Sequence, residues 1–210
     1  MVGKPRWQLT ETVRSGQDGQ DLRSLLQRTW LLPKRMVHYL RIRQNVMVNG
    51  RYQPMNYQVA AGDVVRMAFQ GDEFRTPEAN HYLPTPQPHL TVLYENSDLL
   101  VVSKPRGQKT HPNEDDETGT LMNDAAGYLG GQAFMVHRID KQTSGEVIIA
   151  KNPVVVPILD RLMAAGMIHR QYLAVVDACL QGQGQWRWPI CDDPTDPWRR
   201  KVAGEGANQR

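Results

Sequence analysis

The sequence predicts an α+β protein made of two parts that differ in character. Residues 20–71 combine two helix-period stretches with a short strand pair, and residues 89–210 are dominated by β-rich runs with helical stretches between them. Four prolines and few apolar residues between them predict a linker at 72–88. With 210 residues, 40% of them hydrophobic, the chain can form one small and one medium domain.

The first part is predicted to contain two helices followed by a hairpin. Leucines on one face predict a helix over Asp21–Thr29, and Pro33 suits the first turn of a second helix over Lys34–Arg43. The strand 46–48 leads into Asn49-Gly50, a strong hairpin signal, and a further strand is expected around 62–67. Residues 1–19 are polar and glycine-containing, so they are left unassigned as an N-terminal extension.

The charge is distributed unevenly along the chain. Up to Gln70 there are 11 Lys/Arg and 4 Asp/Glu, whereas the remainder has 14 and 18. The span from Pro33 to Arg51 contains no acid and five basic residues, which are Lys34, Arg35, Arg41, Arg43 and Arg51. Such a cluster suits contacts with a polyanion backbone, although a solvated helix face is the commoner explanation of a charge run.

The second part begins with two β-rich runs, 90–95 and 99–103, joined by a polar turn. The loop that follows, Lys104–Pro112, contains Lys, Arg and His, so it could form the wall of an anion site or a simple surface turn. Helices are expected over 120–129 and from Asn152 to about residue 165, with Asn152 as the cap. A strand is expected over Gln171–Ala178. The tryptophan-containing segment beyond residue 180 could stack exposed Trp and Arg side chains on RNA bases, or it could be an irregular loop with a few buried tryptophans.

One stretch carries the chemistry, residues 136–152, which reads as strand, loop and strand. Its loop contains Asp140 with Arg138 and Lys141 beside it and His137 near. A carboxylate next to cations stays ionised at neutral pH and can act as a nucleophile or a base. From the residues alone, a charged turn between strands is the more common interpretation.

The segment HRIDKQTSG at 137–145 resembles the HRLDxxTSG signature of the RluA-type RNA pseudouridine synthases. The resemblance implies that Asp140 is the catalytic nucleophile and that Arg138 and His137 contact the substrate. The Lys104-Pro105 and His111-Pro112 pairs resemble a family segment near the active site, which implies that Lys104 also lies there. Arg170-x-Tyr172-x-Ala174 resembles the family's K/R-x-Y-x-A, which implies that Tyr172 lies against the target base. Ser103, in place of the usual Asn, and Glu146, in place of an apolar residue, depart from the family pattern.

Residues 20–70 resemble the S4 RNA-binding domain, which commonly precedes the catalytic domain in this family. The implied RNA contacts are Lys34, Arg35, Arg41 and Arg43. The two resemblances together imply an S4-like αα-β domain followed by a mixed or antiparallel-sheet catalytic domain. They also imply isomerisation of uridine to pseudouridine in structured RNA, either rRNA or tRNA, without metal or other cofactor.

The family's later R-x-HQ-I/L-R motif is absent from these 210 residues. We therefore expect the catalytic domain of 89–210 to be C-terminally incomplete, so that an exposed sheet edge allows association of a protein that would otherwise be a monomer. An alternative is a non-catalytic RNA-binding protein derived from such an enzyme by truncation. A sugar-processing hydrolase is a third possibility, but it needs a second carboxylate across a cleft, and none stands out.

Other classes of function have little support in the sequence. Cys179 and Cys191 have eleven residues between them and form no CxxC, and Gly130-Gly131 lacks a nucleotide-binding pattern. The acidic run 114–117 is expected to be a solvated loop. No stretch approaches eighteen consecutive apolar residues, and the N-terminus has no apolar signal-peptide core. We therefore expect a cytoplasmic protein without a membrane span.

Overall fold

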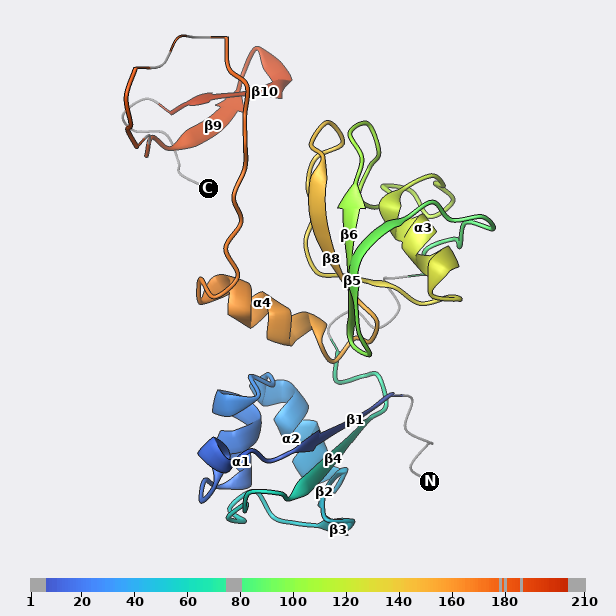
Figure 1. The fold of residues 1–210 in the computed structure, drawn as a ribbon, viewed down its shortest axis with the longest axis vertical. Coiled ribbons are helices and arrows are strands. Elements are labelled where there is room, and N and C mark those ends of the chain that lie inside the picture. Colours follow the sequence, from blue (N-terminus) through green and yellow to red (C-terminus); the bar gives the residue numbers. More distant parts are fainter. Residues whose placement is uncertain (1–6, 75–80, 178, 180, 186, 204–210) are drawn as a thin grey trace. The chain divides into compact units, whose positions relative to one another are not determined.

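The computed structural model describes residues 7–74, 81–177, 179, 181–185 and 187–203. The chain divides into two compact units, Met1–His169 and Arg170–Arg210, which are described separately (Figure 1). The first unit contains two antiparallel four-stranded sheets with their helices, and the second contains a two-stranded hairpin. The mixed α and β composition confirms the predicted fold class.

The first sheet has the strand order β1-β4-β2-β3. Its strands are β1 (Trp7–Thr12), β4 (Val64–Phe69), β2 (Val46–Val48) and β3 (Arg51–Tyr52). The short helix η1 (Ser15–Gln17), α1 (Leu22–Ser24), the π-helical η2 (Leu25–Thr29) and α2 (Lys34–Ile42) complete this part. Leucines of α1 and η2 are buried in one apolar cluster with Met36 and Leu40 of α2 and with Val65 and Met67 of β4. We call residues 7–74 the N-terminal module.

Local chemistry explains the ends of these elements. The side chain of Asp21 accepts a hydrogen bond from the Ser24 amide at 3.0 Å and so caps α1. Asn49 and Gly50 both have positive φ, 51° and 79°, as the tight turn between β2 and β3 requires. Pro33 stands at the N-cap of α2, one position before the first turn in which it was expected.

Strand β1 lies in the segment that the sequence left unassigned. Trp7–Thr12 pairs with β4 from Trp7↔Phe69 to Thr12↔Val64. Its alternation between buried and exposed side chains is weak, because four of its six residues are exposed. Only the partner strand therefore makes this polar segment a strand.

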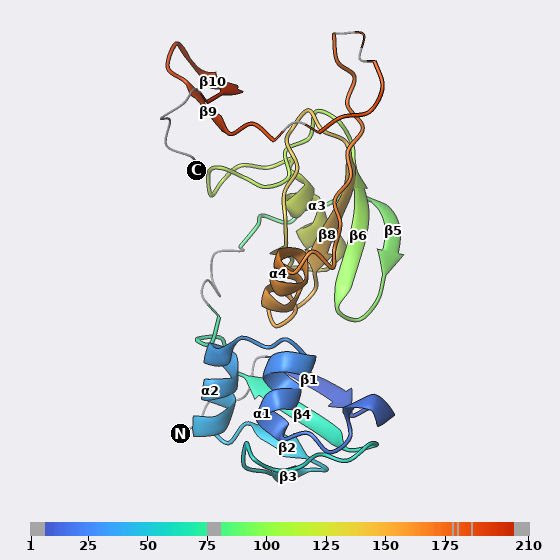
Figure 2. The same ribbon diagram turned by 90° about the vertical axis from the view of Figure 1, so that its left-hand side faces the viewer.

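The second sheet has the order β5-β6-β8-β7 and carries helices on both faces. Its strands are β5 (Thr91–Glu95), β6 (Leu99–Lys104), β8 (Gly145–Ala150) and β7 (Phe134–Met135). Helix α3 (Leu121–Tyr128) packs with Leu100, Val102, Val147 and Ile149. Helix α4 (Val156–Ala164) packs with Phe134 and Ala150, and Ile148 joins this cluster. Figure 2 shows α3 and α4 beside the strands β6 and β8.

The expected β-hairpin and both helices of this part are present, with one change at α4. Asn152 was expected to cap that helix. Its side chain instead accepts hydrogen bonds from the Val154 and Val155 amides, at 3.0 and 3.3 Å, and Val155 is the N-cap. Asn152 thus closes a turn between β8 and α4.

Residues on both sides of 75–80, within and next to the predicted linker, are packed. Phe74 is buried in the core of the N-terminal module, and Glu73 is also buried. The Asn123 side chain donates to the Leu83 carbonyl at 2.9 Å, and the Thr85 amide donates to the Asn123 carbonyl at 3.1 Å. Residues 75–80 lie outside the described part, so the boundary at 72–88 stays a prediction.

The strand predicted over Gln171–Ala178 is wrong for the residues described there. Residues 171–177 form no strand, and Leu173 and Val175 have relative exposures of 105% and 104%. An extended segment becomes a strand only when a partner satisfies its backbone, and none of the described residues pairs with it. The later segment, for which an irregular loop was one interpretation, forms a hairpin of β9 (Ile190–Asp193) and β10 (Asp196–Val202). Trp186 and residues 204–210 lie outside the described part.

Among the described helices, none has the length and apolar character needed to cross a membrane.

Candidate active site

The loop of Asp140 joins β7 to β8. Pairing between these strands is short, Phe134↔Ala150 and Met135↔Ile149, so the chain leaves the sheet early and returns only at Gly145. Asp140 is exposed on this loop, and its carbonyl accepts a hydrogen bond from the Thr143 amide at 3.0 Å. The carboxylate is therefore carried on a closed turn and remains open to a ligand.

Lys104 is the buried anchor beneath that loop. It ends β6 opposite Gly145 of β8, and its relative exposure is 0%. Its Nζ donates to the carbonyls of Pro105, Gln108 and Lys141, at 3.0, 2.8 and 3.4 Å. Burial lowers the pKa of Lys104, and the negative charge of Asp140 acts in the opposite direction. The ammonium thus joins its own loop to the residue that follows Asp140.

Three further hydrogen bonds fasten the two loops together. Thr110 Oγ1 donates to the Ile139 carbonyl at 2.6 Å and lies 3.3 Å from the Ile139 amide, which donates to it. The Gly107 amide donates to the Lys141 carbonyl at 2.7 Å. Ile139 itself is buried in the cluster beneath α3. The backbone on both sides of Asp140 is therefore held, and we call residues 104–112 with 137–144 the tied loops.

Two histidines lie at the tied loops in different roles. The Ile148 amide donates to Nε2 of His137 at 3.1 Å, so the His137 ring is bound to strand β8. His111 is half-buried, and burial followed by the charges of Arg138 and Lys109 lowers its pKa, while Glu117 acts oppositely. His111 is therefore neutral at pH 7, beside the exposed Arg138.

The structure separates the predicted site residues into three groups. Asp140 and Arg138 are exposed on the tied loops. Lys104 and His137 contact backbone groups beneath the loops, and their contact with substrate stays a prediction. Tyr172 lies in the second unit and is 61% exposed, so its position against the target base stays a prediction.

The predicted RNA contacts on α2 also separate. Lys34, Arg35 and Arg41 are exposed, and Nη2 of Arg35 also donates a hydrogen bond to the Asp72 carbonyl at 2.8 Å. Arg43 forms ion pairs with Asp72 and Glu73, and its guanidinium lies 4.5 Å from the centre of the Tyr39 ring.

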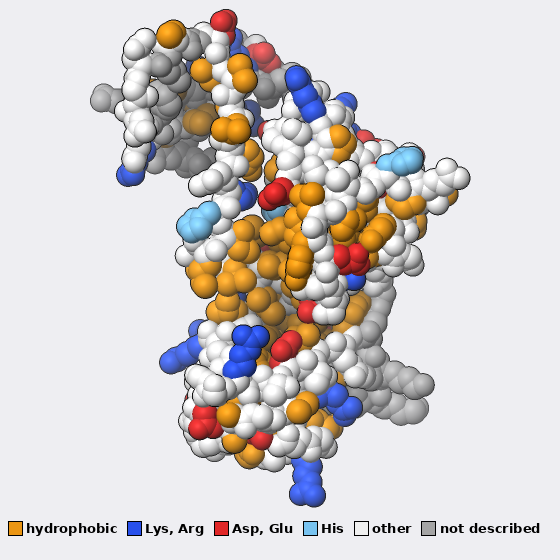
Figure 3. Space-filling view, viewed as in Figure 1, with side chains coloured by type: hydrophobic (Ala, Val, Ile, Leu, Met, Phe, Trp, Pro, Cys, Tyr) orange, Lys and Arg blue, Asp and Glu red, His pale blue; other side chains and the backbone are white. Residues whose placement is uncertain are grey.

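These acids raise the pKa of Arg43, and Arg43 lowers that of Asp72. Arg43 thus joins α2 to the end of the N-terminal module. Figure 3 shows further Lys and Arg side chains over the surface of this module.

Sequence reasoning missed the residues that hold these groups in place. Thr110 and Gly107 lie in a loop that the sequence had already assigned to the site. The sequence therefore indicated where they lie but not which hydrogen bonds they make. Asp72 and Glu73 lay at the predicted linker and gave none. Hydrogen bonds between segments far apart in sequence have no local signature.

Comparison with known proteins identifies the family. The N-terminal domain of the RluD ribosomal pseudouridine synthases matches residues 9–65, and the RNA pseudouridylate synthase family matches residues 98–209. The uncharacterized RNA pseudouridine synthase YhcT of Bacillus subtilis is 32% identical over 92% of this chain and 64% of its own length. A second, YlyB of the same organism, is 36% identical over 78% of this chain and 55% of its own length.

The ribosomal large subunit pseudouridine synthase D of Xylella fastidiosa is 32% identical over 77% of this chain and 49% of its own length. This chain thus spans about half to two thirds of the length of these relatives. The synthase family match covers more than half of the chain and confirms the resemblance of HRIDKQTSG. The protein belongs to the RNA pseudouridine synthase family, of the RluA type.

Proposed function

We propose that the protein isomerises uridine to pseudouridine in structured RNA, with Asp140 as the nucleophile. The observation that carries the proposal is the geometry of the tied loops. Lys104, Thr110 and Gly107 hold the backbone next to Asp140, while its side chain remains exposed. A reactive carboxylate needs this combination of a fixed mount and access.

The reaction that the family implies is an isomerisation, so the substrate and the product have the same atoms. Asp140 attacks the nucleoside of a flipped-out uridine and the glycosidic C–N bond breaks. The uracil then rotates and a C–C bond forms between a ring carbon and the ribose, which releases Asp140. That ring carbon loses its proton, and the ring nitrogen released from the ribose gains one, so the atoms balance. The exposed Arg138 would hold the opened RNA backbone, and Tyr172 would stack on or deprotonate the base. No step requires a metal or another cofactor.

Large-subunit ribosomal RNA is the substrate that we propose, ahead of tRNA. Several similar proteins, including those of Xylella fastidiosa and Salmonella typhimurium, are named ribosomal large subunit pseudouridine synthase D. The match of residues 9–65 to the N-terminal domain of such synthases supports the same choice. The N-terminal module, which we propose to be S4-like, would supply RNA contacts through Lys34, Arg35 and Arg41.

Replacement of the nucleophile tests this function. Asp140→Asn removes the nucleophilic charge with little change in shape, so turnover should fall by at least about 10³-fold while RNA affinity is retained. Pseudouridine is measured by chemical mapping on a large-subunit ribosomal RNA transcript. Asp160→Asn, at an exposed acid on α4, is the matched control and should keep full turnover.

Two outcomes of that experiment count against catalysis by Asp140. Turnover retained in Asp140→Asn would exclude the nucleophile. A wild-type chain that binds the transcript without turnover would support the alternative, a non-catalytic RNA-binding protein.

The basic helix has its own test. Replacing Lys34, Arg35 and Arg41 together by Ala should weaken RNA binding and lower the slope of log affinity against log salt by about 2 to 3, since each phosphate contact contributes about 0.9. Arg43→Met is the contrasting variant, because the Arg43 guanidinium forms ion pairs with Asp72 and Glu73. Its loss should lower the stability of the protein and leave the salt slope of RNA binding unchanged. An unchanged slope in the triple variant would refute the RNA contacts.

We also propose a cytoplasmic protein that is a monomer in its complete form and can associate through a sheet edge. Strand β5 is an edge of the second sheet, and Leu93 and Tyr94 on it are exposed. Sedimentation at increasing protein concentration measures the association.

A further inference from the structure

We propose that Arg161 of α4 is a positioning residue that holds the start of the basic helix α2. It thereby keeps the N-terminal module and the Asp140 loop in one body. This inference rests on the proposed function, because it assigns the two parts to one RNA. Its structural half, the hold on α2, can be tested without RNA.

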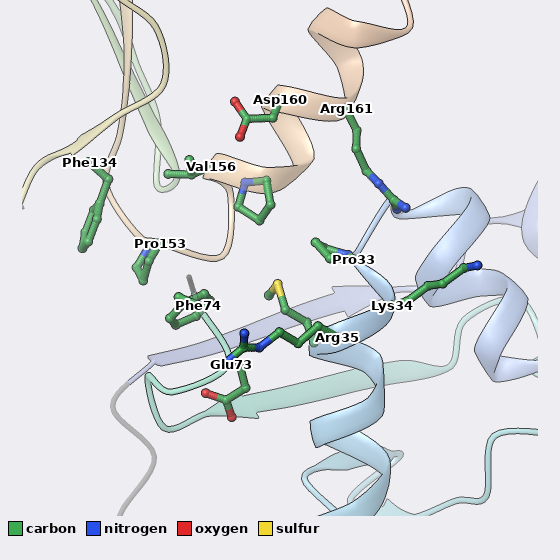
Figure 4. Close-up of a pocket in the computed structure, with 12 residues that line it drawn as sticks. Pro33, Lys34, Arg35, Glu73, Phe74, Phe134, Pro153, Val156, Asp160 and Arg161 are labelled. Atoms are coloured by element: carbon green, nitrogen blue, oxygen red, sulfur yellow. The ribbon is translucent and has the colours of Figure 1, made fainter. Parts of the chain in front are cut away.

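Arg161 reaches from α4 to the connection between η2 and α2. Its Nη1 donates to the carbonyls of Gln27, Leu31 and Leu32, at 3.3, 3.0 and 3.0 Å. Figure 4 shows the side chain of Arg161 extending from its helix toward this connection. One guanidinium nitrogen thus serves three acceptors more than 120 residues away in sequence.

These acceptors are the groups that most need a donor. The last carbonyls of a helical segment have no partner within it, and Gln27 lies in η2. Leu31 has a φ of 60°, in the left-handed region that a leucine rarely adopts. Leu32 immediately precedes Pro33, the N-cap of α2. Arg161 therefore stabilises the strained turn that sets the direction of α2.

Apolar packing supports Arg161 over a limited area. Val154 is buried in the core cluster of the N-terminal module and Ile158 packs against it, while Trp7 packs against this cluster and the one beneath α4. Beside these contacts lies a cavity of about 770 Å³, lined by Pro33, Lys34 and Arg35 of the N-terminal module and by Val156, Pro157 and Arg161 of α4 among others. The first turn of α2 thus borders this cavity, and both apolar contacts and the hydrogen bonds of Arg161 join α4 to the N-terminal module.

The same helix is connected directly to the catalytic loop. The chain runs from Asp140 through β8 and the Asn152 turn into α4, without a long linker. An RNA that contacts both Lys34 or Arg35 and the Asp140 loop would then meet two sites at a fixed spacing. Fixing the spacing raises the effective concentration of the second site, which strengthens binding of an RNA that can reach both.

Hydrogen exchange tests the structural half. In Arg161→Met, the amides of residues 25–37 should exchange at least about tenfold faster, because three carbonyls lose their donor. Arg161→Lys keeps the charge, but its ammonium ends a shorter side chain than Nη1 of arginine does, so its exchange should be intermediate. Arg28→Met removes an exposed arginine of η2 and should leave the rates unchanged. Unchanged exchange in Arg161→Met would overturn the inference.

RNA binding tests the functional half. The wild type should bind a large-subunit ribosomal RNA transcript more tightly than a short RNA hairpin. Arg161→Met should lower affinity for the transcript roughly tenfold and leave that for the hairpin unchanged. An equal loss of affinity for both RNAs would mean that Arg161 has only a structural role, which would overturn the positioning role. Unchanged affinity for both RNAs would overturn it as well. Failure of Asp140 catalysis leaves both readouts intact, so the two failures are distinguishable.

Discussion

Residues 104–112 and residues 171–177 were both predicted to lie near the active site, and they differ in how firmly the structure holds them. Residues 104–112 are bound to the Asp140 loop by Lys104, Thr110 and Gly107. Residues 171–177 have a more strand-like composition, yet they form no strand and expose Leu173 and Val175 fully. A loop rich in charge and proline is thus more firmly held than an apolar segment with high strand propensity.

The difference shows what holds a segment in place. Strand propensity describes how a residue fits a pleated, half-buried surface, and it has no effect until a partner strand supplies that surface. The tied loops instead satisfy backbone carbonyls with a buried ammonium and a threonine hydroxyl, contacts that need no regular partner. If this explanation holds, the two segments will respond very differently to substitution.

The largest expected effect is at Lys104. Lys104→Met keeps the length of the side chain but leaves three carbonyls without their donor, so the free energy of unfolding should fall by about 2–4 kcal/mol. Urea denaturation followed by circular dichroism measures the loss. Lys151→Met, at a partly exposed ion pair with Glu95, is the control and should cost less than about 1 kcal/mol. Equal losses in the two variants would mean that the buried Lys104 stabilises the protein no more than a surface ion pair does.

A smaller effect is expected at His111 and depends on pH. Burial, Arg138 and Lys109 lower the pKa of His111 from its ordinary 6.5, so the unfolded chain binds this proton first as the pH falls. The contribution of His111 to stability is therefore complete above pH 6.5 and is lost as the pH falls through the folded pKa.

His111→Gln should remove this part of the acid sensitivity. Urea midpoints at pH 7.5 and at a series of values below 6.5 measure it against the wild type. Parallel curves for the two proteins would show that the tied loops do not bury His111 in solution.

The smallest effect on stability is expected in residues 171–177. Replacing Leu173 and Val175 by Ser removes two fully exposed side chains, so the free energy of unfolding should change by less than about 0.5 kcal/mol. Self-association measured by sedimentation should decrease, because exposed apolar surface is lost. A loss above about 2 kcal/mol would show that these residues are buried in solution and that the contrast with the tied loops is false.

Much of the fold could be predicted from local patterns. The Asn49-Gly50 turn, the leucines of α1 and η2 and the runs of β5, β6 and β8 are local signals, and the structure confirms each. Strand β1 and the β9–β10 hairpin could not be predicted in the same way. Their residues are largely polar or exposed, and only pairing with another strand defines them.

The candidate site shows the same division. HRIDKQTSG marked Asp140 and the family, because a sequence motif states which residues are present. It did not show that Lys104 and His137 point their nitrogens at backbone groups, or that Arg43 is held by Asp72 and Glu73.

The sequence by itself determined the family, the position of Asp140 and the basic character of α2, since residue identity and spacing are enough for these. Only the tertiary structure decided which cations stay free and which are anchors. Lys104, Arg43 and Arg161 are each bound by an acceptor of this chain that is distant in sequence. These acceptors are the Lys141 carbonyl, the Asp72 carboxylate and the Leu31 carbonyl, which lie 29 to more than 120 residues away. A buried donor must find such a partner or lose hydration without compensation, and folding alone brings that partner within reach.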